Sequence, residues 1–105
     1  MLLYSCQIPI MIGYWKINDP YKDTWRVLIL DEMAKYNESF DDVVLCTITD
    51  EELDISFDAV YGHVQGKPFT LWTKNKVYFP CTFDGSEFVG SVSRDPDGIS
   101  TDHIG

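Results

Sequence analysis

The sequence predicts a single α+β domain, and three observations support this. Its 105 residues fit one domain, and 45% hydrophobic with 24% charged residues is an ordinary globular composition. Apolar residues recur at helical spacing in two segments, and they alternate at strand spacing in the last third. We expect the order β-α-β-α-β-β-β, in a mixed sheet with C-terminal antiparallel hairpins and with two helices packed on one face.

The N-terminal part is expected to form a strand followed by a helix. Residues 2–17 alternate loosely, and no base precedes Lys16, so we interpret them as a strand or a bent pair and not as a targeting segment. Asp19 can cap the helix, and Pro20 suits its first position. One apolar face follows at spacings of three to five: Tyr21, Trp25, Leu28, Ile29, Met33 and Tyr36.

The middle of the chain indicates a strand and then a second helix. Residues 43–49 are β-branched and apolar on both faces, which is typical of a buried central strand. Thr49 and Glu52 have the spacing of a capping box, so the helix is expected to begin there. Its buried face would hold Leu53, Phe57 and Val60 or Tyr61, and Gly62 would end it.

The last third is expected to consist of strands over 69–73, 77–83 and 86–92. Asp84 and Gly85 form a strong two-residue hairpin turn. This turn places Cys81 opposite Phe88 and Thr82 opposite Glu87, and it leaves one face with Val77, Phe79, Cys81 and Phe83.

Two features bound this part of the chain. Pro80 lacks a backbone donor, which predicts an edge or a bulge at its position. Residues 94–105 are polar and predict a loose tail, so the domain is expected to span 1–93.

The charge of the protein is concentrated in one segment. The formal net charge is −9, and residues 31–58 carry all of it, since Lys35 is their single base and the rest of the chain is neutral. The acids of this segment are Asp31, Glu32, Glu38, Asp41, Asp42, Asp50, Glu51, Glu52, Asp54 and Asp58. Such a surface repels nucleic acid and anionic membranes and attracts cations or basic protein surfaces.

Motifs for the common chemistries are missing from the sequence. The cysteines and histidines that could ligate zinc are isolated from one another: Cys6, Cys46, Cys81, His63 and His103. No acidic stretch has the spacing of a calcium loop, and the sequence holds neither a Gly-x-Ser-x-Gly elbow nor a phosphate-binding loop. We therefore expect no metal, no cofactor and no catalytic residues, and three free thiols indicate the cytoplasm.

The acids of the second predicted helix form the leading candidate site. Asp50, Asp54 and Asp58 are spaced by four and would share one side of that helix, beside Glu51. Like charges at this spacing destabilise a helix, so their presence indicates either a functional array aimed at a cationic partner or a solvated face without a binding role. Asp41 and Asp42 are expected to lie next to it.

This combination of features resembles the small acidic proteins that bacteriophages use against host defences, such as DNA-mimic anti-restriction and anti-CRISPR proteins. The resemblance is one of type, since no family motif is matched, and it depends on the acids between Asp31 and Asp58. It implies a non-enzymatic inhibitor that binds the basic groove of a nucleic-acid-handling complex in the host-cell cytoplasm.

Two alternatives follow from other residues. An aromatic pocket of Trp15, Trp25, Trp72 and Tyr78 would indicate a protein that binds or sequesters a nucleotide or metabolite. A small enzyme could use His63 with Cys81 or Cys6, if folding brings them together.

Overall fold

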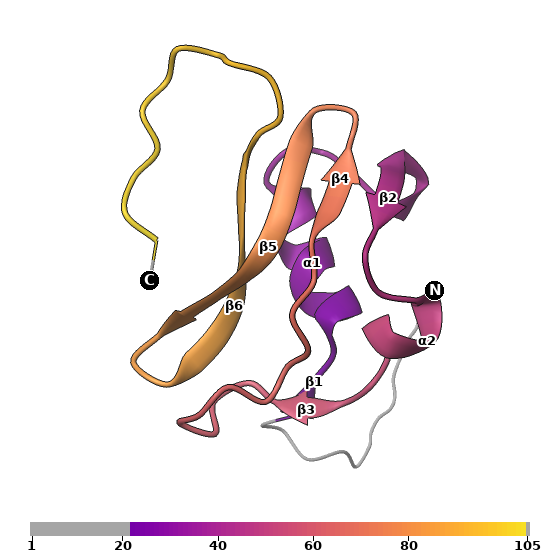
Figure 1. Cartoon of the computed structure of the whole chain (residues 1–105), viewed down its shortest axis with the longest axis vertical. Helices are drawn as coiled ribbons and strands as arrows, with labels where there is room; N and C mark the ends of the chain where they lie inside the picture. Colours follow the sequence, from indigo (N-terminus) through magenta and orange to yellow (C-terminus); the bar gives the residue numbers. More distant parts are fainter. Residues whose placement is uncertain (1–21, 105) are drawn as a thin grey trace.

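The computed structural model describes residues 22–104 and is a single α+β domain, as the sequence predicts (Figure 1). Its elements are β1 (Lys22–Asp23), α1 (Trp25–Ala34), the 3₁₀ turn η1 (Phe40–Asp42), β2 (Val43–Cys46), α2 (Asp50–Leu53), β3 (Phe57–Asp58), β4 (Leu71–Thr73), β5 (Lys76–Phe83) and β6 (Ser86–Ser93). The strand predicted over residues 2–17 lies outside the described residues.

The main sheet has the order β2-β4-β5-β6, and a second sheet joins β1 to β3. Every described strand pair is antiparallel, so the prediction of a mixed sheet is wrong for residues 22–104. A parallel pair needs a crossover helix between two strands of one sheet. Here α1 connects β1 to β2, which belong to different sheets.

The C-terminal hairpin confirms the predicted register. Cys81 pairs with Phe88 and Thr82 with Glu87. Asp84 and Gly85 have φ of 51° and 82°, the left-handed pair that a two-residue hairpin requires. The turn chemistry alone therefore fixes which residues of β5 and β6 face each other.

Pro80 lies where β5 has a free side. In a two-residue hairpin, its backbone nitrogen points away from β6, because Pro80 pairs with Val89 at a position without ladder hydrogen bonds. The pairing of β5 with β4 ends at Tyr78. The missing donor therefore disrupts no described ladder bond, which confirms the predicted edge.

The core lies between α1 and one face of the main sheet. Trp25, Ile29 and Met33 of α1 pack against Leu71, Tyr78 and Val89 of the sheet, and each of these side chains is buried. Phe57 and Phe69 hold the indole of Trp25 at centroid distances of 4.8 and 4.9 Å. Val77, Phe79, Cys81 and Phe83 share the opposite face of the sheet, as their alternation with buried Tyr78 requires.

Helix α1 begins later than the sequence predicts. Thr24 is its N-cap, and the Thr24 hydroxyl accepts a hydrogen bond from Val27 N–H at 3.2 Å. Lys22 and Asp23 are extended, because they pair with Asp58 and Phe57 of β3. The predicted cap Asp19 and Pro20 lie outside the described residues.

Among the described strands, β2 lies at the edge of the main sheet and is largely exposed, so the prediction of a buried central strand is wrong for residues 22–104. Val44 and Leu45 are 63% and 58% exposed. The strand is four residues long, and its pairing with β4 is irregular between Val43 and Leu45. Apolar residues on both faces do not reveal whether a neighbouring strand is present on each side.

The second helix is also shorter than predicted. Helix α2 ends at Leu53, and Phe57 enters β3 to pack on Trp25. An isolated helix of about 12 residues is marginal in water, and the predicted helix over 50–61 contains acids but no bases. The contact between Phe57 and Trp25 therefore outweighs continuation of the helix. Gly62 therefore lies in a loop, with φ of 102°, and does not cap a helix.

Candidate functional site

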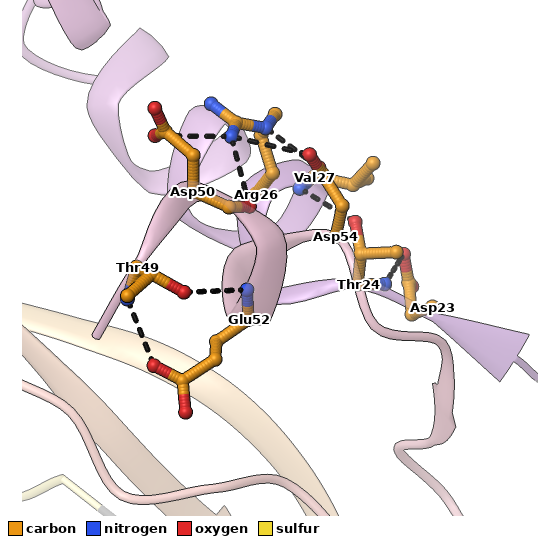
Figure 2. Close-up of polar contacts among 8 residues, drawn as sticks. All are labelled: Asp23, Thr24, Arg26, Val27, Thr49, Asp50, Glu52 and Asp54. Carbon is orange, nitrogen blue, oxygen red and sulfur yellow. Dashed lines mark hydrogen bonds and ion pairs between the residues drawn. The ribbon is translucent and has the colours of Figure 1, made fainter.

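Two short acidic turns lie at the β2 edge of the main sheet, and a capping box fixes each of them. In η1, the Asp42 carboxylate accepts the backbone N–H of Ser39 at 2.8 Å. In α2, the Thr49 hydroxyl and the Glu52 carboxylate each accept the other's backbone N–H, at 3.1 and 2.9 Å (Figure 2). Reciprocal capping satisfies donors that a helix start otherwise leaves unpaired, so both turns are held firmly.

Arg26 of α1 connects the helix to α2. Its Nε donates to Asp54 Oδ1 at 2.7 Å, and its Nη2 lies 3.4 Å from Asp50 Oδ1. Figure 2 shows the guanidinium lying between the two carboxylates. The hydrogen bond with Asp54 raises the pKa of Arg26 further above its ordinary value, so this base stays charged.

The same guanidinium also contacts η1. Its central carbon lies 4.8 Å from the centroid of the Phe40 ring, within the range of a cation–π interaction. Arg26 therefore joins the two acidic turns to one helix, although they are separated in the sequence.

We define the acidic face as the five exposed carboxylates of these two turns: Asp41, Asp42, Asp50, Glu51 and Asp54. Arg26 contacts two of these five carboxylates, those of Asp50 and Asp54. The side chains of Asp50 and Asp54 remain 88% and 57% exposed despite their contacts with Arg26. The turns thus present most of their charge to solvent.

Asp58 does not belong to this face. It is half-buried in β3, and its carboxylate accepts the backbone N–H of Val60 at 3.0 Å. The predicted helical array of Asp50, Asp54 and Asp58 is therefore wrong in its third member, because the helix ends before it.

Glu52 of α2 has two structural partners, the backbone of Thr49 and the side chain of Lys67. Besides its capping bond, it forms an ion pair with Lys67. The hydrogen bond from Lys67, followed by that from Thr49, lowers the pKa of the Glu52 carboxyl below its ordinary value. The ion pair between Glu52 and Lys67 links α2 to the loop before β4.

Three other acids have structural partners that the sequence does not reveal. Buried Glu87 accepts the backbone N–H groups of Gln65 and Gly66 at 2.7 and 3.0 Å. Buried Glu32 accepts the hydroxyl of Ser91 at 2.8 Å, and Glu38 accepts that of Tyr78 at 2.5 Å. Each of these bonds spans 21 or more positions, so local pattern gives no signal for them.

The aromatic residues of the alternative pocket are not gathered around a cavity in the described residues. Trp25 is 2% exposed and Tyr78 is fully buried, both within the core. The Trp25 indole donates to the carbonyl of Lys67, and burial raises the pKa of Tyr78 well above its ordinary value. Trp72 is half-buried and alternates with core residues Leu71 and Thr73, whereas Trp15 lies outside the described residues.

Two residues of the enzyme hypothesis, His63 and Cys81, are described by the structure, and they lie on different parts of the fold. His63 is exposed in the loop after β3, beside an open hollow of about 280 Å³ lined by Gly62, His63, Val64, Thr82 and Gly85. Cys81 is half-buried beside Gly90 on the outer sheet face, and burial raises the pKa of its thiol. A raised pKa disfavours the thiolate that nucleophilic catalysis needs. Cys6 lies outside the described residues.

Residues 22–104 contain no cluster of three or more histidine, cysteine or acidic side chains arranged to hold a metal ion. Within the same range, no helix has the length and apolar character needed to cross a membrane.

Comparisons with protein-family models, with curated protein sequences and with solved structures returned no significant match for this chain. Among residues 22–104, the acidic face is the most complete candidate site.

Proposed function

We propose that the protein is a non-enzymatic binding protein whose acidic face engages the basic surface of a nucleic-acid-handling protein. In this proposal it is an inhibitor from a phage or mobile element, acting on a host defence complex in the host-cell cytoplasm. Carboxylates would stand where the partner ordinarily holds phosphates.

The single observation that carries the proposal is the placement of the charge. The segment 31–58 accounts for the whole net charge of −9, and five of its acids lie exposed on two adjacent turns. A concentrated field of one sign accelerates encounter with a partner of the opposite sign and makes it sensitive to salt.

The rigidity of the two turns supports the same proposal. Asp42 and Glu52 fix their turns by capping, and Arg26 links both turns to α1. Acids on preformed turns lose little conformational freedom on binding, which favours affinity. Asp41 and Glu51 extend from these turns as exposed side chains.

A charge-matched pair of variants tests the proposal. The face variant carries Asp41→Asn, Asp50→Asn and Glu51→Gln, which spare the capping acids and the 2.7 Å bond between Arg26 and Asp54. The control variant carries Asp95→Asn, Asp97→Asn and Asp102→Asn in the exposed C-terminal segment. Both variants change the net charge by the same amount.

Immobilised protein would be used to capture partners from host lysate at low and high salt, with identification by mass spectrometry. We expect a nucleic-acid-handling partner to be retained at low salt by the wild type and the control, and lost by the face variant. Exposed ion pairs contribute about 0.2–1 kcal/mol each, so three of them weaken binding by about tenfold. Equal retention by the two variants would contradict the proposal.

A further inference from the structure

Among the strands of residues 22–104, β6 is the last in the order β2-β4-β5-β6, so no described strand pairs with its outer edge. In the hairpin with β5, the backbone groups of Gly90 and Val92 point toward β5, and those of Ser91 and Ser93 point away. The N–H of Glu87 follows this alternation, since it donates to the carbonyl of Ala59 at 2.6 Å. Between residues 89 and 93, no other described segment donates or accepts a backbone hydrogen bond at this edge.

The edge of β6 also lacks the features that usually protect an edge strand. Such strands are short, bulged, or carry proline or outward charges. Strand β6 is eight residues long and pairs with β5 without a register shift. Its one charged residue, Glu87, is buried and bonded to a loop. Edge strand β2, by contrast, is short and irregular.

The C-terminal segment, residues 94–104, returns along the free side of β6 (Figure 1). Figure 1 shows the chain turning after β6 and running back in the opposite direction, on the side of β6 away from β5. Gly98, with φ of 73°, lies in the returning loop. A chain that reverses in this way has the direction of an antiparallel neighbour.

One side chain of the segment already touches the sheet. A Cβ atom placed on Gly90 would lie 2.6 Å from Cys81 Sγ, 3.1 Å from Phe79 Cε1 and 3.4 Å from Ile104 Cδ1. The side chains of Cys81 and Phe79 therefore fill the space beside Gly90 on the outer sheet face, and the tip of Ile104 packs next to them.

The other end of the segment stands away from the strand. An open hollow of about 400 Å³ lies between the loop 94–101 and the end of β6 at Val92 and Ser93. The segment therefore contacts the sheet at Ile104, whereas the edge of β6 at Val92 and Ser93 is not covered by it.

We propose that residues 101–104 close on β6 as a fifth antiparallel strand and cover its free edge. The Ile104 contact sets the register: Ile104 lies opposite Gly90, and Thr101 opposite Ser93. His103 then exchanges backbone hydrogen bonds with Ser91, and Thr101 with Ser93. Asp102 lies between them, with its N–H directed away from β6.

Amide hydrogen exchange of the full chain, followed by NMR, tests this closure. The amides of Ser91 and Ser93 report on the edge, and those of Gly90 and Val92, which bond to β5, report on the hairpin. A matched pair of variants completes the test. His103→Pro removes a donor that faces β6, whereas Asp102→Pro, one position away, removes a donor that faces solvent.

We expect the Ser91 and Ser93 amides of the wild type to exchange at least about tenfold more slowly than unstructured amides. This protection is lost in His103→Pro and kept in Asp102→Pro, while Gly90 and Val92 stay protected in all three proteins. Unprotected Ser91 and Ser93 in the wild type would overturn the proposal. So would protection that survives His103→Pro, because something other than this strand would then cover the edge.

Discussion

Replacement of Arg26 by methionine tests how the two acidic turns are held together. Methionine keeps an unbranched apolar side chain and removes the guanidinium. The lost contacts are the exposed bond to Asp54, the longer contact with Asp50, which is 88% exposed, and the cation–π contact with Phe40. An exposed ion pair contributes about 0.2–1 kcal/mol and an exposed cation–π contact about 0.5–1 kcal/mol, so Arg26→Met should lower the free energy of unfolding by about 1–2 kcal/mol.

Urea unfolding measures this loss directly. With a denaturant slope of about 1–3 kcal/mol/M for a small domain, the midpoint should fall by roughly 0.3–2 M. Lys74→Met is the matched control, because Lys74 is exposed in the β4–β5 turn and the described residues offer it no ion pair. In 1 M salt the loss should shrink, since the Debye length falls to about 3 Å and the exposed bond to Asp54 is screened.

The same substitution should have the opposite effect on association. Removal of Arg26 leaves Asp50 and Asp54 without their positively charged partner and makes the acidic face more negative, so a cationic partner should associate faster although the protein is less stable. An Arg26→Met protein as stable as Lys74→Met, or a loss that salt does not change, would refute the role assigned to Arg26.

Two further substitutions test the acids outside the face. Glu87→Ala leaves the N–H groups of Gln65 and Gly66 without their acceptor, so urea unfolding should show a loss of about 2–4 kcal/mol, and about half of that for Glu87→Gln, which keeps one acceptor oxygen. A Glu87→Ala protein as stable as the wild type would contradict the role of Glu87 as acceptor for Gln65 and Gly66. Burial raises the pKa of the Asp23 carboxyl, so the fold favours the protonated form of this group. The stability gained from the protonated carboxyl is fully present below the unfolded-state pKa of about 3.9, and it is lost as the pH rises through the pKa of the folded state. Asp23→Asn should therefore be more stable than wild type at pH 7 and equal to it at pH 3, and a destabilised variant at pH 7 would show that the carboxylate is needed in its charged form.

The parts of the fold that could be predicted from the sequence are those set by neighbouring residues. The turn at Asp84 and Gly85 fixes the β5–β6 register, and the pair Thr49 and Glu52 fixes the start of α2. In both cases the deciding contacts span a few positions, and turn and cap chemistry identify them.

The parts that could not be predicted depend on contacts between distant positions. Phe57 packs on Trp25 and belongs to β3, so the second helix ends before it. Asp58 therefore does not share a helical face with Asp50 and Asp54. Strand 43–49 resembles a central strand in composition, but its place at the edge is decided by which strands pair. The pattern of apolar and polar residues predicts neither the early end of the second helix nor the place of this strand in the sheet.

The candidate site shows the same division. The acidic segment is evident from charge counting, but Arg26 reaches Asp50 and Asp54 across 24 and 28 positions. A charge reversal at Asp54 would therefore disturb the fold as well as any binding. For this reason Asp41, Asp50 and Glu51 are the better positions for testing function.

The most direct test of the central claim is the association rate of the captured partner, measured by stopped flow from low to high salt. It compares the wild type with the face variant and with the control variant of equal net charge. The account predicts that the face variant associates more slowly at low salt and has a shallower salt dependence, while the control behaves as the wild type. Equal rates and equal salt slopes for the two variants would mean that net charge alone attracts the partner, and would contradict a binding role for the acidic face.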